Sequence, residues 1–136
     1  MRQERYAVQA SVSAVGTPQA AMVGVVVSDE FEVFFDALGS SRKTVNLRQN
    51  AVAALVLGPV TSAAERTVQL EGMANEPTGA ELDRFLELYF ARFPQGRERR
   101  NWPGMTYWRV TPTWLRYSDY SVEPHDIREY TSFDLR

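Results

Sequence analysis

The 136-residue sequence contains no cysteine, and this absence removes several kinds of chemistry at once. Disulfide cross-links, cysteine-based zinc sites, iron–sulfur clusters and thiol nucleophiles all require cysteine side chains. Nothing in the sequence then points to an oxidising compartment, so we expect a cytoplasmic protein. Because His125 is the single histidine, sites built from several histidines are also excluded, and we expect no metal site.

The sequence also lacks a strong excess of charge of one sign and has no long hydrophobic run. Fifteen Lys and Arg residues stand against 17 Asp and Glu residues, which gives a formal net charge of -2. Nucleic-acid-binding domains usually carry a strong basic excess, so we expect no nucleic-acid partner. No apolar run approaches the roughly 18 residues of a membrane span, and no apolar signal-peptide segment follows the N-terminus. We therefore expect no membrane partner.

The sequence does contain enough apolar material for a core, since 44% of its residues are hydrophobic. A chain of this length fits one domain that buries roughly two-thirds of its unfolded surface. We expect a single domain over residues 1–136, ending in a polar and weakly patterned tail at residues 122–136.

Short strands separated by turn residues dominate the predicted secondary structure. Apolar and polar residues alternate along residues 6–14, with Gln9 and Ser11 between apolar neighbours, which predicts a half-buried strand. Residues 20–27 are apolar almost throughout, which predicts a strand covered on both faces. Further strands are predicted at residues 32–36, 51–57, 67–74, 106–110 and 114–117, the last two separated at Pro112.

Two segments carry helix signals. Thr78 and Glu81 form a T-x-x-E capping box, and apolar residues follow at helical spacing as far as Phe93. A shorter helix is predicted over residues 42–49, with a serine as its N-cap. Gly72, inside a predicted strand, indicates a bulge or a close approach of two backbones.

Many short antiparallel strands leave edges that must be protected from other chains. Closure into a barrel protects them most completely. The residues alone therefore predict a mostly β fold, an antiparallel β-barrel with peripheral helices.

The segment with the most chemical information runs from Phe34 to Leu47 and reads FFDALGSSRKTVNL. A helix N-terminus presents free N–H groups and the positive end of the helix dipole. Ser41 adds a hydroxyl donor there, and the cations Arg42 and Lys43 suit phosphate oxygens. This pattern favours a site for a terminal phosphate dianion. The same residues are also compatible with a capped helix start whose charges are simply solvated.

The order of these elements resembles the FMN-binding split-barrel family of pyridoxamine 5'-phosphate oxidase. The resemblance extends from about Tyr6 to Asp119. Its specific part is S-S-R-K-x-x-N-L at residues 40–47 followed by V-Q-L-E-G at residues 68–72. The resemblance implies an antiparallel Greek-key split barrel that works as a homodimer with FMN at the interface.

The resemblance also implies which residues bind the cofactor. A deazaflavin shares the ring and the phosphate of FMN and is the alternative cofactor. For Gln69, the alternation of its strand is equally compatible with a solvent-facing position. The residues implied are Ser41, Arg42 and Lys43 at the phosphate, and Ala21, Met22, Val23, Asp36, Ala37 and Gln69 along the flavin.

The implied function is that of an FMN-dependent oxidoreductase acting on a small-molecule substrate, with no catalytic residue identified. Such chemistry belongs to the cofactor, which suits a chain without cysteine. The sequence departs from the true oxidases, which have an arginine near Ala21 and Thr-Asn where this chain has Asp36 and Ala37. Vitamin B6 oxidase activity is therefore not expected, and a non-catalytic flavin- or deazaflavin-binding or sensing module is the alternative function.

Several other residues have less specific interpretations. The arginines of residues 97–100 form a charged loop that is either solvated or receives an anionic substrate beside the flavin. His125 is expected at the surface of the tail. Trp108 and Trp114, on predicted strands, are expected to pack in the core or at an interface. Asn46 is expected to stabilise its own helical turn.

Overall fold

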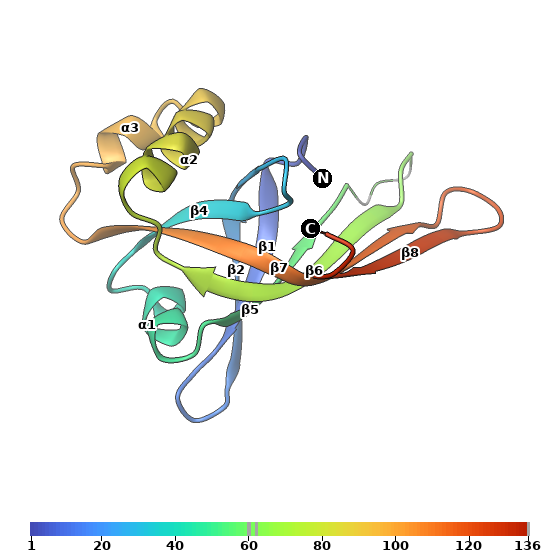
Figure 1. Cartoon of the computed structure of the whole chain (residues 1–136), viewed down its shortest axis with the longest axis horizontal. Coiled ribbons are helices and arrows are strands. Elements are labelled where there is room, and N and C mark those ends of the chain that lie inside the picture. Colours follow the sequence, from blue (N-terminus) through green and yellow to red (C-terminus); the bar gives the residue numbers. More distant parts are fainter. Residues whose placement is uncertain (60, 62, 136) are drawn as a thin grey trace.

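The computed structural model describes residues 1–59, 61 and 63–135. In this part of the chain a mostly antiparallel sheet curls into a half-barrel, with helices on its outside (Figure 1). The elements are β1 (Tyr6–Val12), β2 (Pro18–Gly24), β3 (Val26–Val27), β4 (Val33–Leu38), α1 (Arg42–Gln49), β5 (Val52–Leu57), β6 (Arg66–Asn75), α2 (Gly79–Arg92), α3 (Gly96–Arg99), β7 (Met105–Asp119) and β8 (Asp126–Thr131).

The order of the strands explains why the sheet curls. Neighbouring strands follow the path β2-β1-β5-β6-β7-β4-β3, and β8 pairs with β7 beside this path. Strands β2 and β3 lie at opposite ends of the path but are consecutive in the chain, separated by Val25. The backbone therefore holds the two ends of the path together, and the sheet has to bend round (Figure 1). The predicted antiparallel split barrel is confirmed.

The prediction of a single strand over residues 20–27, covered on both faces, is wrong. The expected single strand is broken at Val25 into β2 and β3. It is also not covered on both faces, because Ala20 is exposed and the side chain of Met22 is 65% exposed. An apolar run cannot distinguish burial in the chain itself from exposure on an interaction surface.

Strand β7 runs without interruption through Pro112, so the prediction of two strands separated at this proline is wrong. Strand β6 pairs along β7, and their register shifts between Glu71 and Gly72, opposite Pro112. Proline is tolerated at such a bulge because the ladder of hydrogen bonds is already interrupted there. The close approach indicated by Gly72 is confirmed, since a Cβ added to it would lie 2.3 Å from the carbonyl oxygen of Thr111.

The C-terminal tail, predicted to be weakly patterned, contains β8. Its residues pair with Trp114–Asp119 of β7, whereas β4 pairs with the first part of the same strand. Most residues of β8 are exposed, so its sequence does not need the alternation by which strands are predicted. The hairpin of β7 and β8 projects from the barrel (Figure 1).

Two separate clusters of side chains stabilise the fold. One fills the inside of the barrel and includes Leu55, Leu70 and Trp108, and the core position expected for Trp108 is confirmed at 3% exposure. The other joins α2 to the outer side of β4. Within it, Phe34 of β4 stacks on Phe85 of α2 with ring centroids 5.1 Å apart. The helical spacing of apolar residues in α2 is thereby explained.

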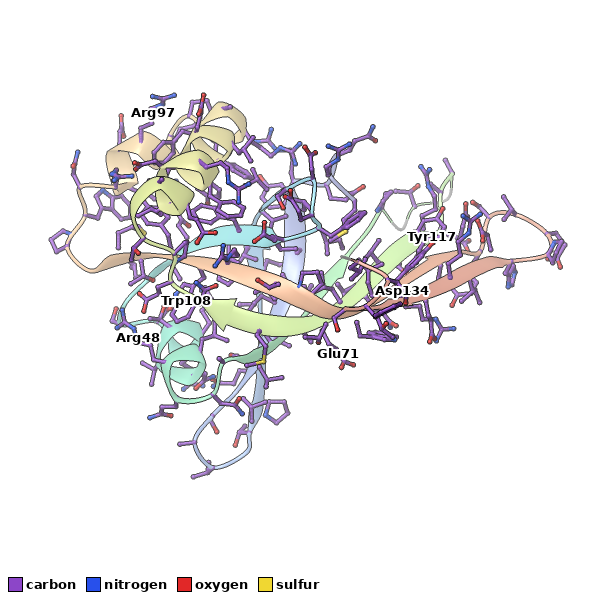
Figure 2. All side chains as sticks on the ribbon, viewed as in Figure 1. Arg48, Glu71, Arg97, Trp108, Tyr117 and Asp134 are labelled. Carbon is purple, nitrogen blue, oxygen red and sulfur yellow. The ribbon has the colours of Figure 1, made fainter. Side chains whose placement is uncertain are left out.

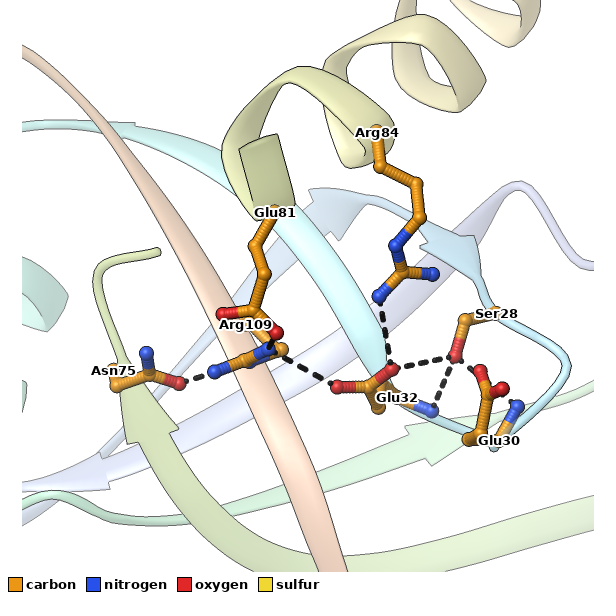
Figure 3. A network of polar contacts seen from close by, with 7 residues as sticks. All are labelled: Ser28, Glu30, Glu32, Asn75, Glu81, Arg84 and Arg109. Atoms are coloured by element: carbon orange, nitrogen blue, oxygen red, sulfur yellow. Dashed lines mark hydrogen bonds and ion pairs between the residues drawn. The ribbon is translucent and has the colours of Figure 1, made fainter. Parts of the chain in front are cut away.

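Polar contacts around Arg109 and Glu32 fix the first turns of α2 over the sheet (Figure 3). Arg109 Nη1 lies 2.7 Å from Glu81 Oε1 and 3.3 Å from Glu32 Oε2. Arg109 Nε donates to Asn75 Oδ1 at 3.0 Å, and Arg84 Nη2 lies 3.5 Å from Glu32 Oε1. The side chains of Arg109 and Glu32 are 14% and 13% exposed. This network ties the helix to β6, to β7 and to the turn that precedes β4.

The predicted start of α2 is confirmed, but the capping box does not form. Thr78 is the N-cap, and within the described residues its side chain makes no capping hydrogen bond. Glu81 instead pairs with Arg109 of β7. No helix among the described residues is both long enough and apolar enough to cross a membrane.

Candidate functional site

Strand β1 turns its two polar residues inward, beside the buried Ala7, and its larger apolar residues outward. Gln9 and Ser11 are 1% and 2% exposed, whereas Tyr6 and Val8 are 55% and 38% exposed. An antiparallel strand with one solvated face normally does the reverse and buries its apolar set. The reversed orientation produces a polar wall inside the sheet and an apolar surface outside it.

The polar wall borders a cavity of about 330 Å³ beside α1. Gln9 of β1 pairs across the sheet with Ala21 of β2, and both residues line this cavity. The described residues that line the cavity include two cations and no carboxylate. They are Gln9, Ser11, Gln19, Ala20, Ala21, Arg42 and Lys43.

Asn46 attaches α1 to this wall. Its Nδ2 donates to Ser11 Oγ at 3.1 Å and to Gln19 Oε1 at 2.5 Å. The expectation that Asn46 stabilises its own helical turn is therefore wrong. Residues three and four positions apart share one face of a helix, so Arg42 and Lys43 lie on the face that Asn46 docks. This explains why both cations reach the cavity.

The first turn of α1 is capped as the sequence predicts. Ser41 is the N-cap, and its Oγ accepts a hydrogen bond from the backbone N–H of Thr44 at 3.4 Å. Thr44 Oγ1 donates to the carbonyl oxygen of Leu38 at 2.8 Å, which fixes the turn to the end of β4. The turn contains no acidic residue and begins with Arg42 and Lys43. The positive end of the helix dipole and two cations therefore coincide, which favours an anion.

The outer surface of the sheet around β1 is apolar and exposed. Met22, Val8 and Val56 are neighbours across β2, β1 and β5, with exposed fractions of 65%, 38% and 45%. Val52 and Met73 form a second pair across β5 and β6. Exposed apolar side chains that lie side by side on a sheet are typical of interaction surfaces. We call these five residues the outer apolar face.

The nine residues implied at the cofactor do not all meet in one place. Ala21, Arg42 and Lys43 line the cavity, and Ser41 caps the helix that carries the cations. The remaining five lie elsewhere. Met22 and Gln69 lie on the outer surface, and Val23 and Ala37 lie in the barrel core. Asp36 belongs to β4 and faces α3. Gln69 pairs with Val56 and so extends the row that Met22 begins.

Asp36 points to the side of the sheet covered by α2 and α3, where it binds Arg99. Arg99 Nε and Nη2 lie 3.2 and 3.1 Å from Asp36 Oδ2. Burial raises the pKa of the nearby Tyr89 phenol, and the negative charge of Asp36 raises it further. The predicted loop at residues 97–100 is thus largely the short helix α3. Its Arg99 is engaged by the protein, while Arg97 lies on the outer side of the helices (Figure 2).

His125 lies far from the cavity, as expected for a surface residue. It belongs to the loop between β7 and β8, at the opposite end of the molecule from α1 (Figure 1). Its ring packs against Tyr120, and its Nε2 lies 3.7 Å from Glu123 Oε2. Figure 2 shows the same separation between Arg48 of α1 and Tyr117 near that loop.

This arrangement matches a known family over most of the chain. The family described as Pyridoxamine 5'-phosphate oxidase matches residues 1–119. The chain belongs to this family. The resemblance inferred from the Ser-Arg-Lys segment and the V-Q-L-E-G strand is therefore confirmed. No curated protein matches the chain at a significant level.

Solved structures agree with the split-barrel fold of the pyridoxamine 5'-phosphate oxidase family. The heme binding protein from Mycobacterium smegmatis superposes with a TM-score of 0.83 at 15% identity, over 97% of this chain and 55% of that chain. HutZ, the heme storage protein from Vibrio cholerae, superposes with a TM-score of 0.72 at 20% identity, over 82% of this chain and 84% of that chain. A pyridoxamine 5'-phosphate oxidase-related, FMN binding protein from Nostoc punctiforme superposes with a TM-score of 0.70 at 14% identity, over 93% of this chain and 81% of that chain.

These likenesses concern the fold, because all three identities are low. The chain spans about half the length of the Mycobacterium protein, at 55%. Within the fold of this family, sequence reasoning missed the contributions of Gln9, Ser11 and Gln19 to the cavity. The signal was the pair of polar residues on one side of β1, but alternation alone does not say which side is covered.

Proposed function

We propose that this chain is a flavin-binding protein that holds FMN in the cavity beside α1, works as a homodimer, and uses the flavin as an oxidoreductase. The observation that carries the proposal is the reversed orientation of β1. A polar inner wall is suited to a polar ligand, and an apolar outer surface is suited to a second protomer. Membership of the pyridoxamine 5'-phosphate oxidase family, which includes the FMN binding protein from Nostoc punctiforme, supports the same proposal.

The phosphate of FMN fits the cationic mouth of the cavity. Arg42 offers a planar guanidinium that can bind two phosphate oxygens, and Lys43 adds a second charge. Ser41 holds the helix start in place by capping it. A hydrogen bond to a charged group contributes about 1.5–3 kcal/mol, so two cations supply a substantial part of micromolar affinity.

The ring of the flavin is proposed to lie between two protomers. The outer apolar face contains Met22, and Gln69 continues the same row beside Val56. Both residues are implied cofactor contacts that lie outside the cavity of one protomer, so a partner that covers this face would bring them to the ring. Val23 and Ala37 would contribute through backbone groups, since their side chains are buried. The role of Asp36 stays a prediction.

The chemistry in this proposal comes from the cofactor, since bound FMN supplies a hydride acceptor. The chain's own residues bind the phosphate, orient the ligand and exclude water. The side chains that line the cavity are amides, a hydroxyl, methyl groups and two cations, with no carboxylate or imidazole among the described residues. The departures from the true oxidases at Ala21, Asp36 and Ala37 favour the second candidate, a flavin- or deazaflavin-binding module without catalysis.

The proposal is tested by titrating the purified chain with FMN and following flavin absorbance and fluorescence. We expect micromolar or tighter binding of FMN. A double variant, Arg42→Ala with Lys43→Ala, should weaken FMN about 100-fold and riboflavin less than threefold, since riboflavin lacks the phosphate. The control is Arg48→Ala on the same helix, because Arg48 pairs with Glu76 at 2.9 Å and does not line the cavity. Equal losses for both ligands would contradict the phosphate site.

Two further measurements separate the candidates. Anaerobic addition of NADPH or NADH to the FMN complex bleaches the flavin band if the protein is an oxidoreductase, and leaves it unchanged if it is a binding module. Heme, named for two of the similar structures, is titrated in parallel. Tight heme binding without FMN binding would overturn the flavin proposal.

A further inference from the structure

Gln9 is the feature of the cavity wall that the phosphate site does not explain. Its side chain is 1% exposed and belongs to the inner face of β1. Among the described residues its Nε2 has no hydrogen-bond partner, although Gln9 lines the cavity. Native proteins rarely leave a buried amide unpaired, because water would have satisfied it in the unfolded chain.

Two acceptor oxygens of the same wall are already engaged in holding the fold together. Ser11 Oγ and Gln19 Oε1 both accept hydrogen bonds from Asn46 Nδ2, at 3.1 and 2.5 Å. These contacts fix α1 to β1 and β2 and need no ligand. Gln9 takes no part in this network, and its cross-strand partner Ala21 lines the same cavity. Gln9 Nε2 is therefore a buried donor on a residue that lines the cavity, and no hydrogen bond within the described residues uses it.

The charge of the site indicates which part of a ligand this donor meets. Arg42 and Lys43 stand at the start of α1, where a dianion gains most from charge and dipole. Gln9 comes from β1 and carries no charge, and a neutral buried amide suits a neutral oxygen. In FMN the neutral oxygens next to the phosphate are the hydroxyls of the ribityl chain.

We propose that Gln9 Nε2 donates a hydrogen bond to a ribityl hydroxyl of the bound flavin and so selects ligands with a polyol chain. This inference rests on the proposed flavin binding. In this arrangement the two cations of α1 bind the phosphate, and Gln9 of β1 binds the neutral chain. Riboflavin and FMN share that chain, so Gln9 contributes equally to both.

The test replaces Gln9 by methionine, an unbranched side chain of similar length without a donor. The affinities of the wild type and Gln9→Met for FMN and riboflavin are measured by flavin fluorescence, together with the melting temperature of the ligand-free proteins. We expect Gln9→Met to weaken both flavins about tenfold, leaving their ratio unchanged. Its ligand-free melting temperature should rise, because the unpaired buried amide is gone. Gln9→Leu gives the same comparison with a different shape, should the first variant fold poorly.

Tyr107→Phe is a matched control. Tyr107 Oη is also buried and lacks a hydrogen-bond partner among the described residues, and Tyr107 does not line the cavity. This variant should raise the melting temperature and leave both affinities unchanged.

Three results would overturn the inference. Unchanged binding of both flavins by the Gln9 variants would make Gln9 an unpaired core residue without a role in binding. A loss confined to FMN would mean that Gln9 contacts the phosphate and not the ribityl chain. A wild-type protein that binds neither flavin would overturn the proposed function itself, and this inference with it.

Discussion

Arg99 donates two hydrogen bonds, from Nε and Nη2, to a single carboxylate oxygen of Asp36, 63 residues earlier in the chain. The family resemblance implied a flavin contact for Asp36. Arg99 belonged to a charged loop that was expected to be either solvated or a receptor for an anionic substrate. In the structure the two residues bind each other. Their side chains are 29% and 18% exposed, so the pair is partly desolvated. The contact joins α3 to β4 and closes the helical side of the sheet.

Removal of Arg99 should therefore destabilise the fold. We expect Arg99→Ala to lower the free energy of unfolding by about 1–3 kcal/mol, between the values typical of exposed and buried pairs. The cause is the unpaired Asp36 carboxylate that remains partly buried. Urea denaturation measures this change. The control is Arg100→Ala, because Arg100 is the next residue in the chain and is exposed. Equal effects of the two substitutions would contradict the assigned role of the ion pair.

A charge on the outer apolar face should prevent dimer formation. We expect Val8→Asp and Val56→Asp to convert a dimer into a monomer, because each carboxylate would be buried against a second protomer. Sedimentation velocity or light scattering measures the change in mass. Val15→Asp is the control, since Val15 is 89% exposed in the turn between β1 and β2 and lies outside the face. A wild-type protein that is monomeric at tens of micromolar would refute the dimer proposal.

Tyr89 should make the fold sensitive to alkaline pH. Burial, followed by the charge of Asp36, raises the pKa of its phenol above the ordinary value. An unfolded tyrosine ionises near pH 10, so below that pH both states keep the proton and no dependence arises. Above it the unfolded state loses the proton first, and stability falls as pH rises. The free energy of unfolding, measured by urea denaturation between pH 9 and about 11, should fall less steeply with pH for Tyr89→Phe than for the wild type. Parallel curves would contradict the prediction.

Gly72 should not tolerate a side chain. A Cβ at this position would lie 2.3 Å from the carbonyl oxygen of Thr111 and 2.9 Å from Val110 Cγ1. The neighbour is backbone in the paired strand, which cannot move without opening the bulge. We expect Gly72→Ala to lower the free energy of unfolding by about 1–3 kcal/mol. Glu71→Ala, an exposed position at the same bulge, should change it by less than about 0.5 kcal/mol. Comparable effects of the two would show that the bulge adapts.

Much of the local structure could be predicted because it depends on neighbours in the chain. The alternation of β6 buries Val68, Leu70 and Ala74 as its period requires. Ser41 caps α1 because a hydroxyl at that position reaches the free N–H of Thr44. Gly72 marks a bulge because it lacks a side chain. The cationic turn of Arg42 and Lys43 was likewise visible, since the cap, the helix start and the two charges are contiguous.

Local rules failed where a distant segment changed their context. Pro112 would end an ordinary strand, yet it sits opposite the bulge at Gly72, which interrupts the ladder anyway. Glu81 was expected to complete a capping box, but it pairs with Arg109 of β7, a residue 28 positions away in the chain. The strand β8 was missed because its exposed residues carry no period, and pairing with β7 alone forms it.

By itself, the sequence determined most of the strands, the two main helices and the cationic turn, because each follows from contacts within a few residues. Only the tertiary structure decided which face of β1 is covered. Period-2 alternation defines two faces of a strand but does not say which one meets the core. In this fold the sheet curls so that Gln9 and Ser11 face the cavity and Val8 faces outward. The same long-range closure joined Asp36 to Arg99, since a contact across 63 residues leaves no local signal.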